Sequence, residues 1–175
     1  MPVRRIVIYG DPVLRKQAEP VIEIDDTLKE LIADMIETMV EAEGIGLAAP
    51  QVGESVAVCV VNMELIDQTL EPKAFINPVV LDDAGQISME EGCLSIPEIR
   101  DDILRPESIT VTYQDEAGVE HTEKCEGMLA RVLQHEIDHL NGILFIDRLG
   151  PMKRKLLTKK LRKLAEESSS GVFMP

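Results

Sequence analysis

Residues 135–139 are His135, Glu136, Ile137, Asp138 and His139, an HExxH pattern inside a segment, 127–140, whose apolar residues recur every three or four positions. This spacing predicts an amphipathic helix that ends at Asn141-Gly142. At about 100° per residue, both histidines and the glutamate fall on one side of the helix. Two imidazoles one turn apart can bind one metal ion, and the glutamate beside them can accept a proton from water. The pattern therefore predicts a metal-binding helix at the centre of the fold.

The segments on either side of this helix predict an α+β fold. Residues 25–43 carry an apolar stripe at helical spacing, and a third helix is expected to begin near Pro151. β-Branched runs bounded by turn residues predict strands over residues 56–61, 75–81, 108–113 and 119–125. Because crossover helices do not alternate with these strands, we expect mostly antiparallel strands packed around the HExxH helix, with an N-terminal helix and a C-terminal helix.

The composition excludes several classes of protein. The 175 residues suffice for one domain with a buried core, and 18 basic against 32 acidic residues give a net charge of −14. This charge argues against DNA or anionic lipid as a partner of the whole surface, and 3% aromatic residues argue against a base-stacking module. The sequence contains no apolar run of about 18 residues, so no membrane span is expected. Three cysteines, an odd number, indicate a reducing compartment.

The charge is divided unevenly along the chain. Residues 1–151 hold 11 basic and 30 acidic residues, a net of −19, whereas residues 152–175 hold seven basic and two acidic residues, a net of +5. We therefore expect a body, residues 1–150, followed by a basic C-terminal helix, residues 151–167. The serine-rich segment after this helix predicts a disordered tail, residues 168–175. The asymmetry predicts a separate partner for the basic helix.

A catalytic metal site usually has three protein ligands and an open position, so the two histidines need a third partner. Downstream of the HExxH pattern the chain has no further histidine and only three carboxylates, Asp147, Glu166 and Glu167. Upstream, Cys93 lies in EGCLSIP, residues 91–97, between turn-forming neighbours and outside any apolar run. A cysteine there can be a ligand, a nucleophile or an inert core residue, and the residue type alone leaves these alternatives open.

Residues 44–53, GIGLAAPQVG, form a third unusual segment. Gly-x-Gly-x-x-Ala also occurs in dinucleotide-binding turns, but those follow a strand and open a helix, whereas here a helix precedes and Pro50 and Gly53 follow. We therefore reject a dinucleotide site. Small side chains let a ligand approach the backbone closely, and the amide of Gln51 can both donate and accept hydrogen bonds. A tight turn with a surface glutamine is the alternative.

Together the three segments resemble the three signature motifs of the peptide deformylase family: GIGLAAPQ at residues 44–51, EGCLS at 91–95 and QHEIDH at 134–139. The resemblance extends to DPVLR at 11–15, INP at 76–78 and DHLNG at 138–142, so it covers most of residues 3–150. No motif position departs from the family's pattern. The resemblance implies a hydrolase that removes the formyl group from the N-terminal formyl-methionine of newly synthesised polypeptides and releases formate.

The resemblance also implies a role for each residue of the site. One metal ion per chain would be bound by Cys93, His135 and His139; it is usually Fe²⁺ in this family, with Zn²⁺, Ni²⁺ or Co²⁺ able to substitute. Glu136 would take a proton from the attacking water and deliver it to the leaving amine. Negative charge on the formyl oxygen would be stabilised by the side-chain amide of Gln51 and the backbone N–H of Leu94.

Substrate contacts follow from the same resemblance. Ile45 and Gly46 would offer main-chain groups for strand-like pairing with the substrate peptide, and Arg100 matches a position that contacts the substrate backbone. We expect two residues of the HExxH helix to line a pocket for the methionine side chain, Val132 and Leu133. A buried polar support for the ligands is expected from Arg105 with Asp138 or Glu91.

Related enzymes dock on the ribosome near the exit of the nascent chain, which suggests a partner for the basic helix. We expect residues 153–163 to make a salt-sensitive contact with ribosomal RNA. The alternative is a solvated basic face folded back on the acidic body. The form of the motifs and the lack of long insertions resemble the bacterial type I branch, which implies the bacterial cytoplasm more than an organelle.

Three other functions are compatible with parts of the pattern. The first is an HExxH metallopeptidase that uses a different third ligand. In the second, Cys93 is a thiolate nucleophile with His135 or His139 as its base. The third is a structural metal domain or an inactive family member that acts as a binding module. The presence of Gln51, Cys93 and Glu136 argues against the last, because a structural site needs neither an open position nor a general base.

Overall fold

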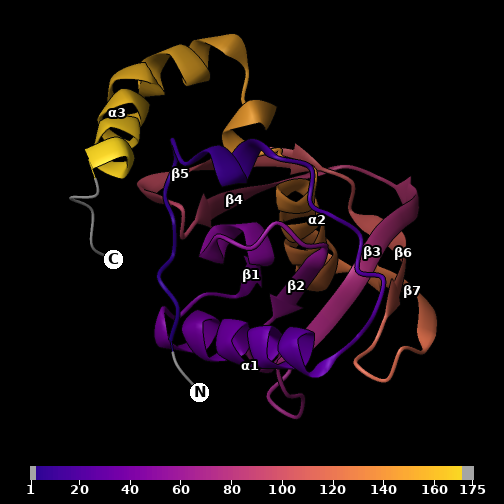
Figure 1. The fold of residues 1–175 in the computed structure, drawn as a ribbon. Coiled ribbons are helices and arrows are strands. Elements are labelled where there is room, and N and C mark those ends of the chain that lie inside the picture. The colour runs from indigo at the N-terminus through magenta and orange to yellow at the C-terminus, as the bar shows by residue number, and fades with distance from the viewer. Residues whose placement is uncertain (1–2, 171–175) are drawn as a thin grey trace.

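A five-stranded antiparallel sheet and a two-stranded hairpin pack around α2, the helix that carries the HExxH pattern, in the computed structural model, which describes residues 3–170 (Figure 1). The strand order in the sheet is β1-β2-β3-β6-β7, with β1 at Gly46–Ala48, β2 at Val58–Val61, β3 at Lys73–Ala84, β6 at Ser108–Gln114 and β7 at Glu120–Glu126. The hairpin pairs β4, Ile87–Cys93, with β5, Ile96–Arg105. The α+β class and the antiparallel pairing expected from the sequence are confirmed.

Three helices and four short 3-10 turns complete the fold. The helices are α1, Asp26–Glu41, α2, Gly127–Leu140, and α3, Pro151–Ser170. The 3-10 turns are η1, Pro12–Arg15, η2, Ala49–Val52, η3, Met63–Leu65, and η4, Phe145–Arg148. None of the helices within residues 3–170 is long and apolar enough to cross a membrane.

Helix α1 delivers the chain to the first strand of the sheet. It begins where the side chain of Asp25 accepts a hydrogen bond from the N–H of Leu28, an N-cap that satisfies one free donor of the first turn. Its apolar stripe is buried against β1 and β2. Glu43 adopts a left-handed conformation, φ 58°, directly after the helix, and this turn leads the chain into β1.

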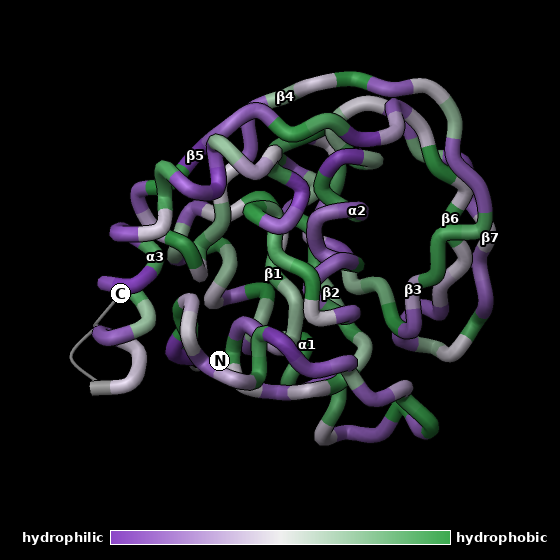
Figure 2. The backbone as a smooth tube through the Cα atoms, turned by 90° about the horizontal axis from the view of Figure 1, so that it is seen from above, coloured by the Kyte–Doolittle hydropathy of each residue, from purple (hydrophilic) through white to green (hydrophobic). Residues whose placement is uncertain are grey.

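Helix α2 carries a dense set of polar side chains into the interior. Figure 2 shows hydrophilic residues of α2 in the middle of the molecule, with the apolar strands β1 and β2 beside them. Six of its polar or charged residues are less than a tenth exposed: Arg131, Gln134, His135, Glu136, Asp138 and His139. Burial of such groups costs free energy unless they are paired or bound, so their partners identify what the helix does.

The β4–β5 hairpin was not expected as a strand pair from the sequence. Cys93, expected in a loop, is the last residue of β4 and pairs with Ile96 of β5 across a tight turn. The buried apolar residues of β5, Ile96, Ile99 and Ile103, are separated by charged ones, and the register shifts between Gly92 and Cys93. This irregularity breaks the strict alternation by which a half-buried strand is detected in a sequence.

Helix α3 extends over Pro151–Ser170 and therefore includes three residues, 168–170, that the sequence placed in a disordered tail. Residues 171–175 of that tail lie outside the described residues. The apolar side of α3 packs on a cluster that contains Ile8, Leu14 and Leu149 through its residues Leu157, Leu161 and Leu164. This contact binds the helix to the N-terminal segment of the body.

Candidate functional site

The three polar residues of the HExxH pattern lie together on the buried side of α2. His135, Glu136 and His139 are 8%, 3% and 1% exposed, and the two imidazole rings are 5.1 Å apart between centroids. The helical spacing of four residues produces this proximity, as the sequence indicated. The two rings can therefore bind one ion.

Cys93 is brought to the two histidines by the β4–β5 turn. Its Sγ lies 3.3 Å from Nε2 of His139. Ligand atoms of Cys93, His135 and His139 all lie within 4.8 Å of one another, and this is the one group within residues 3–170 that could hold a metal ion. One thiolate and two imidazoles suit Fe²⁺, Zn²⁺, Ni²⁺ or Co²⁺ better than Mg²⁺ or Ca²⁺, which prefer oxygen ligands.

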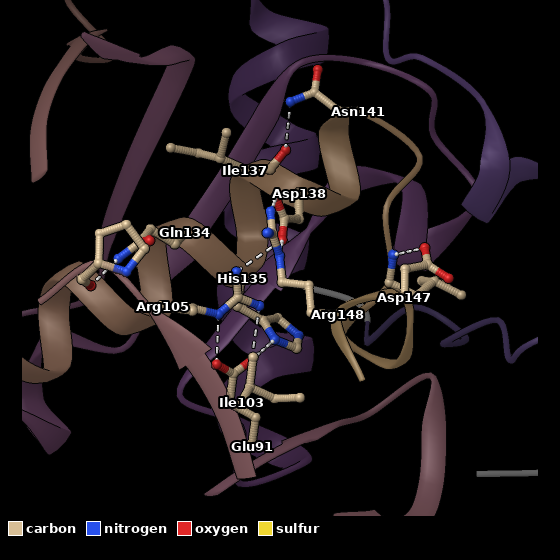
Figure 3. A network of polar contacts seen from close by, with 12 residues as sticks. Glu91, Ile103, Arg105, Gln134, His135, Ile137, Asp138, Asn141, Asp147 and Arg148 are labelled. Atoms are coloured by element: carbon tan, nitrogen blue, oxygen red, sulfur yellow. Dashed lines mark hydrogen bonds and ion pairs between the residues drawn. The ribbon is translucent and has the colours of Figure 1, made fainter. Parts of the chain in front are cut away.

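A buried ion-pair network contacts His135 through the Nδ1 atom of its ring (Figure 3). Nδ1 of His135 lies 2.9 Å from Oε1 of Glu91, so a neutral ring that donates from Nδ1 leaves the lone pair of Nε2 free for a metal. Arg105 donates to both oxygens of Glu91 and to Oδ2 of Asp138 at 2.8 Å. Arg148 donates to both oxygens of Asp138. The expected support from Arg105 is confirmed, and it contacts both carboxylates.

The network fixes the charge of its members. Burial alone would raise the pKa of Glu91, but hydrogen bonds from His135 and Arg105 outweigh burial and hold the pKa well below its usual range. Burial opposes a charged His135, yet Glu136, Cys93 and Glu91 together raise the pKa of that ring. Burial and the neighbouring His135 lower the pKa of His139. Glu91 is therefore an anion at neutral pH.

Glu136 lies in the same buried space without a hydrogen-bond partner for its Oε1 among residues 3–170. Burial raises the pKa of Glu136 to about 7, opposed by the charges of His135 and Arg105 and assisted by those of Glu91 and Asp138. A buried carboxylate with a free oxygen beside a metal site has the properties of a general base.

Gln51, on η2, points its amide at Cys93. Its Oε1 accepts a hydrogen bond from the backbone N–H of Ala48 at 2.9 Å, which orients the side chain. Its Nε2 therefore faces the β4–β5 turn, 3.1 Å from Oγ of Ser95 and 3.5 Å from Sγ of Cys93. Leu94 forms the same turn and lines the cavity next to Cys93.

A cavity of about 620 Å³ opens onto this site. Its wall contains most residues predicted from the sequence: Ile45, Gly46, Gln51, Cys93, Leu94, Arg100, Val132, His135 and Glu136. His139 and Leu133 do not line it. Leu133, expected in a methionine pocket, is fully buried in the core on another side of α2, and Met128, one turn before Val132, lies in the wall instead.

Strand β1 is an edge strand of the sheet, and Ile45 and Gly46 at its start line the cavity. The carbonyl of Ile45 accepts a hydrogen bond from the N–H of Asn62 at 2.8 Å, so the backbone groups of Ile45 face β2. Successive residues of a strand direct these groups to opposite sides, and the N–H and C=O of Gly46 therefore face the open edge. Of the two residues expected to pair with a peptide, Gly46 is the one whose backbone groups face this edge.

Arg100, on β5, lines the same cavity as Gly46 of β1. It donates from Nε to Oε1 of Glu90 at 2.7 Å, and its guanidinium covers Gly92, where a Cβ would lie 2.5 Å from one of its nitrogens. The Arg100 side chain is 62% exposed, so its other donors can reach a ligand in the cavity.

Two important residues were missed from the sequence. Arg131 is 5% exposed and donates to Glu91 at 2.6 Å and to the carbonyls of Ile103 and Ile87. Its position four residues before His135 places it on the same side of α2 as that histidine, a signal that could have identified it. Arg148 lies beyond the helix, and nothing in the local sequence indicates its pairing with Asp138.

Comparison with known proteins agrees with this site. A family model described as polypeptide deformylase matches residues 3–155. A peptide deformylase of Mesorhizobium japonicum is 45% identical over 98% of this chain and 98% of its own length, and one of Chlorobaculum parvum is 49% identical over 87% and 83%.

Solved structures extend the comparison to the fold. A peptide deformylase of Legionella pneumophila has a TM-score of 0.86 and 41% identity, covering 96% of this chain and 98% of that one. A plant peptide deformylase has a TM-score of 0.90 and 32% identity, covering 100% and 95%. The motifs, the geometry of the site and these similarities lead to one conclusion: the chain belongs to the polypeptide deformylase family.

Proposed function

We propose that this protein hydrolyses the formamide bond of N-formylmethionyl peptides and releases formate, using a divalent metal ion held by Cys93, His135 and His139. The observation that carries the proposal is the convergence of four groups on one cavity: the Cys93–His135–His139 cluster, which lines it through Cys93 and His135, together with Glu136, the amide of Gln51 and the open edge at Gly46. Membership in the deformylase family supports the same reaction.

The donor set fits the proposed metal, because a thiolate and two imidazoles lie close enough to share one ion and Glu91 fixes the ring of His135. When bound, such an ion supplies Lewis acidity to a water molecule and to the formyl oxygen. Affinity alone would not select Fe²⁺ over Zn²⁺, so the proposal of Fe²⁺ as the native metal rests on the family.

Glu136 moves the proton. Its unpaired Oε1 is the buried acceptor in the cavity wall, and it takes the proton of the attacking water. After the attack on the formyl carbon, the same carboxyl group delivers that proton to the nitrogen of the leaving amine. The free oxygen and the burial of Glu136 suit this shuttle, since no donor among residues 3–170 pairs with its Oε1.

Gln51 and Leu94 stabilise the charge that develops on the formyl oxygen. Nε2 of Gln51 is oriented by Ala48 and points to the cysteine side of the cavity. The backbone N–H of Leu94 would be the second donor. Loss of one such donor typically lowers kcat by about 10²–10³-fold.

The substrate peptide lies along the edge of β1 and pairs with the backbone of Gly46 as an added strand. Its methionine side chain enters the apolar part of the cavity beside Met128 and Val132. Arg100, in the wall of the same cavity, contacts the peptide backbone. These contacts assign the substrate end of the cavity to residues on three different elements.

We further propose that residues 1–150 form the catalytic unit and that α3 contacts ribosomal RNA in the bacterial cytoplasm. Two of the seven cations of α3 pair with the body, Lys153 with Asp101 and Arg154 with Asp147. The other five, Lys155, Lys159, Lys160, Arg162 and Lys163, are exposed. Five exposed cations on one helix suit binding to a phosphate backbone. The two cations that pair with the acidic body account for only part of the positive charge of α3.

The test is anaerobic purification with metal analysis, followed by an assay of formate release from a formyl-Met peptide. The proposal expects about one metal ion per chain and formate release that decays in air but persists with Ni²⁺. A folded, fully metallated protein that releases no formate would overturn it. Cleavage of an internal peptide bond under the same conditions would favour the metallopeptidase.

A further inference from the structure

The segment from Arg4 to Tyr9 takes no part in the chemistry proposed above. It nevertheless connects two elements of the site, η2, which carries Gln51, and the β4–β5 turn, which follows Cys93. Figure 1 shows it running from beside α1 towards β5 and α3. At its start, the backbone N–H of Arg4 donates to Oγ1 of Thr38 at 2.8 Å. The guanidinium of Arg4 donates to Asp34, which is 1% exposed, so the segment is anchored to α1.

Two backbone hydrogen bonds then attach the segment to the site. The N–H of Val7 donates to the carbonyl of Gln51 at 2.8 Å, and the N–H of Tyr9 donates to the carbonyl of Ser95 at 2.8 Å. Ile6, just before Val7, is buried in the apolar cluster around α1. Ile8, between Val7 and Tyr9, is buried in the cluster that also contains the leucines of α3. Both the hydrogen bonds and the alternating burial fix the path of this segment.

The two residues that accept these hydrogen bonds also contact each other. Nε2 of Gln51 donates to Oγ of Ser95 at 3.1 Å. Gln51 belongs to η2 and Ser95 to the β4–β5 turn, elements that are 44 positions apart in the sequence. The distance between η2 and this turn determines where the Gln51 amide lies relative to Cys93.

The far end of the segment is held as well. At Gly10, a Cβ would lie 2.6 Å from the Cα of Ala165, so α3 packs directly on the backbone there. Gly10 has φ +107°, a conformation that glycine adopts without strain. The segment is thus fixed by α1 at one end and by α3 at the other.

We propose that Val7–Tyr9 is a positioning strap whose two backbone N–H groups hold η2 and the β4–β5 turn at the separation that directs the Gln51 amide to the formyl oxygen. The proposal rests on the function proposed above, because it assigns Gln51 as a donor to that oxygen. A misplacement of about 1 Å in a catalytic group can cost about 10²-fold in rate, so a small relaxation of this separation has a large effect.

The experiment compares two substitutions at one position. Val7→Pro removes the N–H that bonds to Gln51, whereas Val7→Ala shortens the side chain and keeps the N–H. We expect Val7→Pro to lower kcat for a formyl-Met peptide about tenfold or more with little change in KM, because the donor acts in the transition state. Val7→Ala is expected to remain within about twofold of the unaltered protein.

A second measurement observes the amide itself. In the Zn²⁺-loaded protein, the ¹⁵N–¹H resonances of the Gln51 side chain, assigned by their absence in Gln51→Glu, should shift or broaden in Val7→Pro and stay in place in Val7→Ala. A merely structural strap would lower the melting temperature and leave these resonances unchanged. Equal kcat values and equal Gln51 resonances in the two variants would overturn the proposal.

These outcomes separate the strap from the proposed function. If the unaltered protein releases no formate, the function fails, but the Gln51 resonances still report whether Val7 positions the amide. If Val7→Pro does not fold, Tyr9→Pro is measured in the same way against Tyr9→Ala, since both lose the side chain that contacts Arg15 and only Tyr9→Pro loses the N–H that bonds to Ser95. Amide exchange in the unaltered protein adds a check without substitution, since Val7 and Tyr9 amides that exchange as fast as an unfolded chain would also overturn the strap.

Discussion

Gly46 lies directly against the carboxylate of Glu136. A Cβ built at Gly46 would lie 2.5 Å from Oε2 of Glu136 and 2.8 Å from Cγ1 of Val132. Strand β1 and helix α2 therefore lie so close together at Gly46 that no side chain fits between them. This contact, together with its position at the open edge, explains why the residue here is glycine.

Gly46→Ala is expected to displace the carboxylate of Glu136 and to lower kcat about 10- to 100-fold, since small misplacements of a catalytic group are costly. Formate release at saturating substrate measures the effect. Gly150→Ala is the matched control, because a Cβ there meets nothing within 4 Å. Equal activity of the two variants would show that the close contact does not set the position of Glu136.

Glu91→Gln should weaken both the fold and the metal site. Glu91 is 6% exposed and faces the buried guanidinium groups of Arg105 and Arg131, so loss of its charge is expected to cost on the order of 3–5 kcal/mol in the free energy of unfolding. Metal affinity should fall about 10- to 100-fold, because Glu91 also orients His135.

The neighbouring Glu90→Gln is a suitable control for Glu91→Gln. Glu90 and Arg100 form an ion pair whose side chains are 61% and 62% exposed, and such pairs contribute about 0–1 kcal/mol. Urea unfolding and metal titration of both variants give the comparison. A Glu91→Gln protein as stable as Glu90→Gln would contradict the role of the buried network.

Asp147 should make stability dependent on acid pH. Burial raises the pKa of Asp147, but hydrogen bonds from Arg15 and the N–H of Leu144, with the charge of Arg154, outweigh burial and lower it. A lowered pKa in the folded state means that the ionised carboxylate stabilises the fold above the unfolded pKa of about 3.9, and that this contribution is lost as the pH falls through the folded pKa.

The measurement is urea unfolding of the unaltered protein and Asp147→Asn between pH 3 and pH 7. We expect a constant stability advantage of the unaltered protein above about pH 5 and a shrinking one below about pH 4. Loss of metal in acid affects both proteins alike, so the difference isolates Asp147. An advantage that grows towards pH 3 would contradict the assignment.

Cys93→Ser distinguishes the proposed enzyme from two of its alternatives. Removal of the thiolate should abolish tight metal binding, because two imidazoles remain and Nε2 of His139 loses its 3.3 Å neighbour. A metallopeptidase with another third ligand would keep its metal. An enzyme that uses Cys93 as a nucleophile would remain active after chelation and lose activity on alkylation.

The exposed cations of α3 can be tested without removing the helix, whose leucines cover part of the core. Simultaneous Lys155→Glu, Lys159→Glu and Lys163→Glu should strongly reduce co-sedimentation with ribosomes at low salt and leave formate release unchanged. The matched control is Lys153→Glu, because Lys153 already pairs with Asp101 at 2.8 Å. Unchanged co-sedimentation of the triple variant would refute the ribosome contact.

Local patterns in the sequence predicted much of this structure. The spacing of His135 and His139 on one helix fixed their proximity, and the apolar stripes gave α1 and α2 to within a few residues. Contacts between distant segments followed no such local rule. The approach of Cys93 to His139 depends on the β4–β5 turn, and its role came from the family's motifs.

The errors have physical causes. The β4–β5 hairpin was missed because charged residues and a register shift interrupt its alternation. Leu133 was expected beside Val132 in the methionine pocket, but a rotation of about 100° per residue turns its side chain into the core. Arg148 and the backbone bonds of Val7 and Tyr9 depend on tertiary contacts, which no single segment encodes.

Glu136 gives the most direct test of the proposed reaction. Formate release from a formyl-Met peptide should be measured for the unaltered protein and Glu136→Gln, with metal content determined on the same samples. We expect about one metal ion per chain in both proteins and a kcat about 10²–10⁴-fold lower in Glu136→Gln, because the amide cannot accept the proton of water. Absence of formate release by the metallated, unaltered protein, or an equal rate in Glu136→Gln, would contradict the proposed reaction.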